Sequence, residues 1–168
     1  MDRPLPNTYW VIPGRLLAGE HPFGADDADA RARLSRLREA GVDYFVDLTQ
    51  EYECPGYRHL LPAVAKHVRS AIADTWVPDD AAQMEQILSD IRAALALGRC
   101  IYVHCRAGIG RTGLVVGCFL AEEEGGNGKA ALKLLNRLWR QSERAKTWTK
   151  VPQTVEQANY IRQWPMRR

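Results

Sequence analysis

The sequence predicts an α/β fold with a central, mostly parallel sheet of about four to five strands flanked by helices. Short runs rich in β-branched and aromatic residues alternate along the chain with stretches whose apolar residues recur at three- and four-residue steps. That alternation is typical of parallel strands joined by helices, which cover both faces of the sheet. With 168 residues, 46% of them hydrophobic, the chain has the size and composition of one globular domain, residues 1–168.

The expected strands are short and are bounded by turn residues or acidic residues. Pro13 and Gly14 divide the first run and predict a small hairpin at the edge of the sheet. The last run, CIYVHC, ends at Cys105 and leads into a glycine-containing turn. We expect strands within residues 9–20, 42–49, 67–73 and 100–105.

The expected helices are marked by apolar spacing and by the residues at their ends. Asp26 or Asp27 provides the N-cap of the first helix, and Gly41 ends it. The helix that follows Cys105 is apolar on all sides, which indicates a position in the middle of the core. We expect helices within residues 26–40, 57–65, 80–98, 111–124, 129–140 and 154–164.

Composition and charge disfavour several classes of function. The net charge of +3 is too weak for a nucleic-acid-binding surface, although it suits an anionic substrate. No apolar run approaches the roughly 20 residues of a membrane span, and the first residues carry no secretion signal. The four cysteines lack the C-x-x-C spacing of metal or dithiol sites. We therefore expect a cytoplasmic monomer that needs no metal or cofactor and binds neither nucleic acid nor membrane.

Two features far apart in the sequence are expected to meet at one edge of the sheet. Ligands in such folds bind at the carboxyl ends of the strands. A loop with Asp74, Asp79 and Asp80 follows the strand expected within residues 67–73, and the turn after Cys105 follows the last strand. The predicted site therefore combines a cysteine with an aspartate.

The segment HCRAGIGRTG, residues 104–113, carries the chemistry of this site. The turn between Cys105 and Arg111 directs backbone N–H groups at one point, where an oxyanion fits. Gly108 and Gly110 permit the backbone angles of the turn, and the guanidinium of Arg111 can bind two phosphate oxygens at once. The same dipoles stabilise a thiolate at Cys105, the form of cysteine that acts as a nucleophile.

This segment resembles the signature loop of the protein tyrosine phosphatase superfamily, in which a cysteine, five residues, an arginine and a serine or threonine follow one another. The chain is similar to the compact dual-specificity branch, because it is short and lacks the extension with which tyrosine-specific members grip the phosphotyrosine ring. The segments LLAGEHPFG and TVEQ are also similar to small microbial members of that branch. The resemblance is strongest in the second half of the chain.

The resemblance implies a role for each residue of the loop. Cys105 attacks phosphorus and forms a phosphocysteine intermediate, while Arg111 binds the phosphoryl oxygens. Thr112 stabilises the departing thiolate in the second step, and His104 orients the cysteine. The phosphate-binding residues are Arg106, Ala107, Gly108, Ile109, Gly110 and Arg111.

The family's mechanism also needs an aspartate that protonates the leaving group and later accepts a proton from water. Asp74 is the first candidate, because it lies at the end of a predicted strand, as the general acid does in compact members. Asp79 follows Pro78 in WVPD, which is similar to the tryptophan-proline-aspartate loop of classical members, and Asp80 comes next. Asp79 and Asp80 remain alternatives to Asp74.

The expected reaction is the hydrolysis of phosphomonoesters, above all phosphotyrosine of proteins, with phosphoserine and phosphothreonine as further substrates. An inositol phosphate or phosphoinositide is an alternative substrate, although Ile109 stands where lipid-directed members often carry lysine. Rival functions are a phosphoprotein-binding module with weak or no turnover and a rhodanese-like sulfurtransferase. The complete set of Cys105, Arg111 and Asp74 disfavours both rivals.

Two residues outside the signature loop are weaker candidates. Cys54, in the loop after the strand within residues 42–49, could act as a resolving thiol that protects an oxidised Cys105. Gln157 in TVEQ resembles a glutamine of the family's C-terminal segment that approaches the site. A solitary thiol and a solvated helix residue are the respective alternatives.

Overall fold

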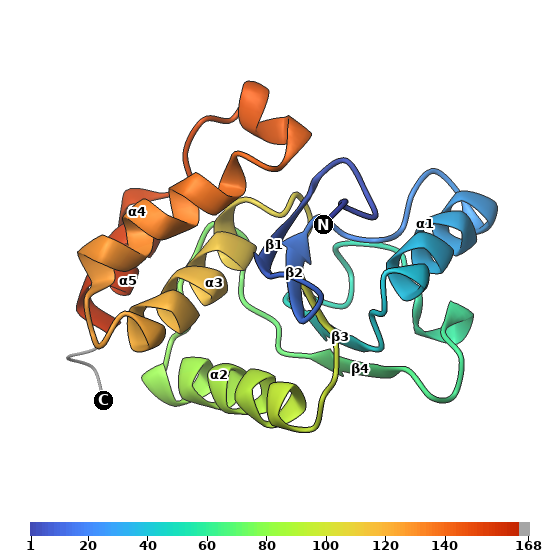
Figure 1. Cartoon of the computed structure of the whole chain (residues 1–168), viewed down its shortest axis with the longest axis horizontal. Coiled ribbons are helices and arrows are strands. Elements are labelled where there is room, and N and C mark those ends of the chain that lie inside the picture. The colour runs from blue at the N-terminus through green and yellow to red at the C-terminus, as the bar shows by residue number, and fades with distance from the viewer. Residues whose placement is uncertain (165–168) are drawn as a thin grey trace.

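The computed structural model describes residues 1–164 and confirms the α/β architecture (Figure 1). Residues 165–168, the end of the predicted domain, lie outside the described part of the chain. The strands are β1 (Thr8–Ile12), β2 (Leu16–Gly19), β3 (Tyr44–Asp47), β4 (Lys66–Arg69) and β5 (Ile101–His104). The helices are α1 (Asp27–Glu39), α2 (Ala81–Ala96), α3 (Gly110–Glu123), α4 (Gly128–Trp139) and α5 (Val155–Gln163). Two short 3₁₀ helices are η1 (Arg58–Leu60) and η2 (Glu143–Lys146).

The five strands form one sheet in the order β1-β2-β5-β3-β4, which is parallel except at one edge. β1 pairs antiparallel with β2, whereas β2, β5, β3 and β4 run parallel to one another. The predicted hairpin is present, but only β1 is an edge strand, because β2 lies between β1 and β5. Gly19 of β2 and Asp47 of β3 both pair with His104 of β5. The carboxyl ends of three strands therefore meet beside the signature loop.

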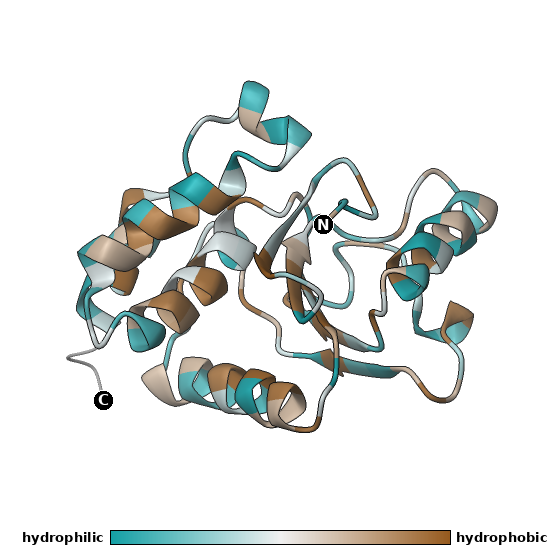
Figure 2. Cartoon of the chain, in the orientation of Figure 1, coloured by the Kyte–Doolittle hydropathy of each residue, from teal (hydrophilic) through white to brown (hydrophobic). Residues whose placement is uncertain are grey.

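Helices cover both faces of the sheet, as the alternation of elements predicts. α1 packs on one face, where its Leu34 joins Phe45 and Tyr102 in a buried cluster. α2, α3 and α4 pack on the opposite face, α5 packs on α3 and α4, and these four helices share a larger core with strand residues such as Val103. The central strands and much of α3 are brown in Figure 2, in keeping with the buried position predicted for this helix. No helix within residues 1–164 has the length and apolar character needed to cross a bilayer.

The strand predicted within residues 67–73 is shorter than expected. Its regular ladder ends at Arg69, although Ser70 and Ile72 still donate backbone hydrogen bonds to the end of β3, at 2.9 and 3.1 Å. Asp74 therefore follows an irregular extended segment and not a regular strand.

The helix expected within residues 57–65 is also shorter, because only the 3₁₀ helix η1 forms there. Leu61 precedes Pro62 and adopts extended backbone angles, as a residue before proline prefers, and this ends the helical turn. The 3₁₀ helix η2 is not among the predicted elements.

Candidate active site

The signature loop connects β5 to α3 and leaves Cys105 only 3% exposed. Gly108 has a φ of 74°, in the region that favours glycine. A Cβ atom on Gly108 would lie 2.5 Å from the carbonyl carbon of Gly19 at the end of β2. The hydroxyl of Thr112 donates to the carbonyl oxygen of the same Gly19 at 3.4 Å. The loop thus closes tightly against a neighbouring strand, and only glycine fits at position 108.

Groups outside the loop bind its carbonyl oxygens. The backbone N–H of His21 donates to the carbonyl oxygen of Arg106 at 3.1 Å, and the guanidinium of Arg144 donates to that of Ala107. By contrast, no backbone N–H of residues 106–109 donates a hydrogen bond to any group within residues 1–164. A run of unpaired N–H groups that follows a buried cysteine provides the donors that an oxyanion needs.

Arg111 lies in the first turn of α3 and is 1% exposed. Its two terminal nitrogens donate to the two carboxylate oxygens of Glu53 at 2.7 and 2.9 Å. Nη1 also donates to the carbonyl oxygen of Ile72 at 3.0 Å. Burial alone would lower the pKa of Arg111, but the hydrogen bonds to Glu53 and the nearby Cys105 raise it above its ordinary value. Arg111 is therefore a fixed cation.

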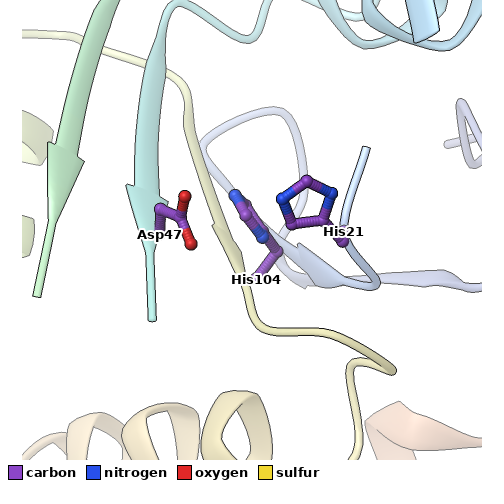
Figure 3. A group of neighbouring side chains, drawn as sticks. All are labelled: His21, Asp47 and His104. Carbon is purple, nitrogen blue, oxygen red and sulfur yellow. The ribbon is translucent and has the colours of Figure 1, made fainter. Parts of the chain in front are cut away.

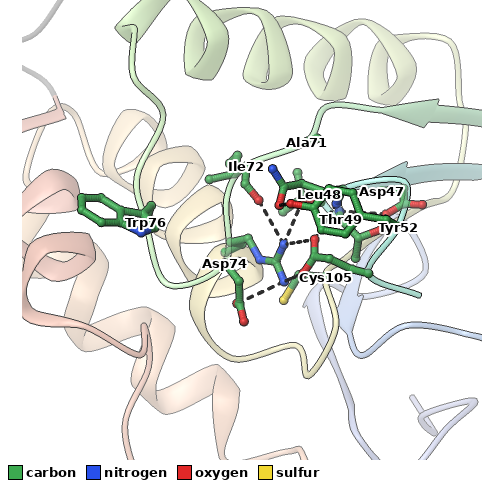
Figure 4. A network of polar contacts seen from close by, with 12 residues as sticks. Asp47, Leu48, Thr49, Tyr52, Ala71, Ile72, Asp74, Trp76 and Cys105 are labelled. Carbon is green, nitrogen blue, oxygen red and sulfur yellow. Dashed lines mark hydrogen bonds and ion pairs between the residues drawn. The ribbon is translucent and has the colours of Figure 1, made fainter.

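One edge of the Arg111 guanidinium is left for a ligand. Its Nε is buried and has no hydrogen-bond partner within residues 1–164, while Nη2 lies 3.1 Å from Oδ1 of Asp74 (Figure 4). The Nε–H and one Nη2–H point along the same edge of the planar group, the arrangement that binds two oxygens of a phosphate. The unpartnered Nε of a buried arginine beside Cys105 therefore fits a phosphoryl group.

Of the three candidate aspartates, Asp74 is the one that contacts Arg111. Its side chain is 52% exposed, so it can also reach a bound substrate. Asp80 instead accepts the backbone N–H of Ala82 and caps α2. Asp79 is exposed and forms no ion pair within the described chain. The structure thus brings Asp74 to the signature loop, in spite of the shortened strand before it.

Hydrogen bonds connect the segment after Asp74 to the start of α5. Thr75 has a φ of 68°, which is uncommon for a residue other than glycine. Nε2 of Gln157 donates to the carbonyl oxygen of Trp76 at 3.1 Å, and the hydroxyl of Thr154 donates to that of Thr75 at 3.5 Å. Gln157 is fully buried and also forms a capping box with Thr154. Gln157 is therefore a buried contact of the aspartate loop and not a solvated helix residue.

His104 is fully buried beside Cys105. Its Nε2 lies 2.6 Å from the hydroxyl of Tyr57, and its Nδ1 lies 3.3 Å from the carbonyl oxygen of Cys105. Because a carbonyl oxygen can only accept, Nδ1 carries the proton and Nε2 accepts the hydrogen bond from Tyr57. Burial lowers the pKa of His104 to about 3, so the ring is neutral at physiological pH.

A buried polar cluster of His21, Asp47 and His104 lies behind the loop (Figure 3). One atom of each lies within 4.8 Å of the others, a spacing compatible with a metal ion. However, Asp47 already pairs with His67 and Arg69, at 3.1 and 3.2 Å. Nδ1 of His21 accepts a backbone N–H, so its Nε2 carries a proton and cannot act as a ligand. The ring of His21 packs edge-to-face on that of His104, with centroids 5.0 Å apart, so the cluster surrounds His104 but is a poor metal site.

Glu53 and Tyr57 are not among the residues predicted from the sequence. Both lie in the loop region after β3, at the sheet edge where ligands of such folds bind. An acidic residue that follows a strand at this edge was the available signal for Glu53, as it was for Asp74. Next to Glu53, Cys54 lines a hollow together with Arg106, but burial and Glu53 raise the pKa of its thiol. A resolving role for Cys54 stays a prediction.

Sequence comparisons place this chain among phosphatases. Residues 5–158 match the PTP-SAK family, described as Swiss Army Knife protein, DSP-PTPase phosphatase domain. Protein 067L of Invertebrate iridescent virus 3, whose name places it among tyrosine phosphatases, is 37% identical over 94 residues, which are 53% of this chain and 38% of 067L. The phosphatidylglycerophosphate phosphatase PTPMT2 of Arabidopsis thaliana is 30% identical over 110 residues, 65% of this chain and 45% of PTPMT2. The chain thus spans less than half the length of these relatives.

Solved structures share the fold. Tk-PTP in its active form has a TM-score of 0.77 at 22% identity, covering 97% of this chain and 99% of Tk-PTP. PTPMT1 in complex with PI(5)P has a TM-score of 0.72 at 20% identity, covering 94% of each chain. Together with the signature loop, the family match over most of the sequence assigns the protein: this chain belongs to the PTP-SAK family of dual-specificity-like phosphatases in the protein tyrosine phosphatase superfamily.

Proposed function

We propose that this chain hydrolyses phosphomonoesters through a phosphocysteine on Cys105, and that its main substrates are phosphotyrosine residues of proteins. Phosphoserine and phosphothreonine are further substrates. The observation that carries the proposal is the pairing of the buried Cys105 with two sets of unpaired donors, the N–H groups of residues 106–109 and the Nε of Arg111.

In the first step, the thiolate of Cys105 attacks phosphorus in line with the ester oxygen. The S–P bond forms, the P–O bond to the leaving group breaks, and its electron pair stays on the leaving oxygen. Asp74 donates a proton to that oxygen, which is why it must lie at the mouth of the loop. The loop N–H groups and Arg111 hold the other three oxygens and stabilise their charge. A phosphate on this edge of Arg111 replaces the contact with Asp74 and so frees the carboxyl group.

In the second step, water attacks phosphorus and the carboxylate of Asp74 accepts its proton. The S–P bond breaks, inorganic phosphate forms, and the thiolate of Cys105 is restored. The hydroxyl of Thr112 can turn from its long contact with Gly19 to donate to the departing sulfur. His104 and Glu53 act as positioning residues, because they contact Cys105 and Arg111 without facing the substrate.

Two exposed aromatic side chains support an aryl phosphate as substrate. Trp76 is 67% exposed on the loop that carries Asp74, and Tyr52 is 82% exposed on the loop that carries Glu53. Figure 4 shows them on opposite sides of the contacts around Asp74 and Cys105. Aromatic side chains in such positions can pack against the ring of a phosphotyrosine.

The proposal is tested with one panel of enzymes and substrates. Wild type, Cys105→Ser, Asp74→Asn and Asp79→Asn are assayed on phosphotyrosine and phosphothreonine peptides, on p-nitrophenyl phosphate and on a phosphoinositide, with and without a chelator. We expect Cys105→Ser to abolish turnover and the chelator to have no effect. Asp74→Asn should slow the alkyl ester much more than an activated aryl phosphate. Activity that survives Cys105→Ser, or a larger loss from Asp79→Asn than from Asp74→Asn, would contradict the scheme.

A phospholipid headgroup is the second candidate substrate. The similarity to PTPMT2, a phosphatidylglycerophosphate phosphatase, and the fold shared with PTPMT1 in complex with PI(5)P favour it. The same mechanism applies, because it acts on the phosphate and not on the group that carries it. If kcat/KM for phosphatidylglycerophosphate or a phosphoinositide exceeds that for every phosphopeptide, the main substrate is a phospholipid headgroup and not protein phosphotyrosine.

A further inference from the structure

A groove of about 940 Å³ lies between α4, α5 and the segment that joins them. Cys105 is not among its lining residues, but Thr154 at its rim contacts Thr75 of the aspartate loop. Gln153, which also lines the groove, packs on the signature loop, since a Cβ atom on Gly110 would lie 3.0 Å from its Oε1. The groove therefore begins at the edge of the active site and leads away from it.

The lining of the groove is strongly basic. It includes the exposed cations Lys133, Arg140, Lys150 and Arg162, and no acidic side chain. Within residues 1–164, none of the four forms an ion pair. Unpaired cations around a concave surface focus a positive potential, which attracts an anionic partner and orients it.

The walls of the groove are preformed. The side-chain amide of Asn136 donates to the carbonyl oxygen of Val151 at 2.7 Å and accepts its N–H at 3.0 Å. The indole N–H of Trp139 donates to the carbonyl oxygen of Trp148 at 2.7 Å. The side chains of Trp148 and Val155 remain 40% and 69% exposed, and both line the groove. A fixed groove with apolar contacts loses little binding energy to ordering.

We propose that this groove binds an acidic segment of the protein substrate, close in sequence to its phosphorylated residue. This inference rests on the proposed protein phosphatase activity and extends it to the choice of substrate. A concave groove that starts at the catalytic loop accommodates an extended peptide, whereas a flat bilayer surface cannot enter it. Carboxylates of such a peptide meet the four unpaired cations while its phosphate lies over Cys105.

The test uses two phosphotyrosine peptides that differ only in their flanking residues, glutamate and aspartate in one and glutamine and asparagine in the other. The groove variant is Lys133→Glu with Lys150→Glu. The control variant, Arg31→Glu with Arg36→Glu, makes the same change in net charge on α1, which covers the opposite face of the sheet. Neither variant alters a residue of the signature loop, so turnover of p-nitrophenyl phosphate reports an intact active site.

We expect wild type to prefer the acidic peptide by about tenfold in kcat/KM, mainly through KM, as several exposed charge pairs would provide. The groove variant loses this preference, the control variant keeps it, and roughly 0.5 M salt removes it in wild type by screening. Equal kcat/KM values for the two peptides in wild type, or equal losses in both variants, would overturn the proposal.

A binding measurement separates this proposal from the proposed function. The fluorescence anisotropy of a labelled, unphosphorylated acidic peptide reports occupation of the groove without any turnover. Binding that Lys133→Glu with Lys150→Glu abolishes would support the groove even if no phosphopeptide were hydrolysed. If phosphatidylglycerol vesicles bound through these two lysines while the peptide did not bind, a lipid surface would replace the peptide as the occupant.

Discussion

The ion pair between Glu53 and Arg111 leads to a prediction about how the phosphate-binding arginine is held. Glu53→Gln keeps the shape of the side chain and removes its charge. Glu53 now accepts two charge-assisted hydrogen bonds from Arg111, at 2.7 and 2.9 Å. A glutamine offers a single oxygen, so one of these bonds is lost and an NH₂ group faces the guanidinium. Arg111 is then free to tilt away from the edge that binds phosphate.

The size of the effect follows from the lost hydrogen bond. A hydrogen bond to a charged group contributes about 1.5–3 kcal/mol. Only 10% of the Glu53 side chain is exposed, so water cannot fully replace it. If this energy positions Arg111 for the transition state, kcat/KM falls by roughly 10- to 150-fold. The structure therefore gives Glu53 an effect on catalysis although it does not face the substrate.

The assay is kcat/KM for p-nitrophenyl phosphate, together with the inhibition constant of inorganic phosphate, which reports the anion site alone. Glu51→Gln is the matched control, because Glu51 lies in the same loop and is exposed. We expect weaker phosphate inhibition in Glu53→Gln and no change in Glu51→Gln. Wild-type kcat/KM in Glu53→Gln, with a folded protein, would refute the positioning role.

Three further predictions concern the surroundings of the loop. Gln157→Glu keeps the capping box but removes the donor to the aspartate loop. Turnover of an alkyl phosphate should fall by about tenfold, and turnover of an aryl phosphate should fall much less. Equal losses on the two substrates would contradict this prediction. Gly108→Ala should abolish activity through its contact with β2, whereas Gly125→Ala, with a φ of 64° and no atom within 4 Å of the added Cβ, should only lower the thermal midpoint. Burial lowers the pKa values of His21 and His104 to about 4 and 3. Below about pH 6.5 the unfolded chain therefore binds more protons than the folded chain. The free energy of unfolding should be highest above that pH and should decrease as the pH falls toward 4. Urea unfolding of His21→Gln should show a smaller decrease in the free energy of unfolding between about pH 6.5 and 4 than wild type shows. An unchanged decrease would exclude His21 as its source.

The local parts of the site could be predicted from the sequence. The spacing from Cys105 to Arg111 is a property of one continuous loop, so a short sequence pattern reveals it. Asp74 could be predicted because strands of a parallel sheet end at one edge. The predicted position of Asp74 beside the signature loop is correct even though the regular strand before it ends at Arg69. The reason is that the backbone N–H of Ile72 still donates to the carbonyl oxygen of Leu48, directly after β3.

The contacts that position these residues could not be predicted in the same way. Glu53 and Arg111 are 58 residues apart, and the irregular turn that brings them together has no periodic pattern. Tyr57 reaches His104 through a single hydroxyl, which no spacing rule identifies. The irregular segment after α4 forms the groove wall because Asn136 binds the backbone of Val151, a contact that depends on the folded path of the chain. Such long-range polar contacts follow only from the tertiary structure.

The central claim is that Cys105 carries the phosphoryl group between two steps. In Asp74→Asn the second step lacks its base, so an activated aryl phosphate should convert the enzyme to the intermediate faster than water removes it. The most direct measurement mixes this variant with p-nitrophenyl phosphate, stops the reaction with denaturant and locates phosphate by mass spectrometry. We predict one phosphoryl group on the peptide that contains Cys105, with a matching burst of nitrophenol. Phosphate on another residue would contradict the account. So would turnover that yields no phosphorylated peptide and that Cys105→Ser leaves undiminished.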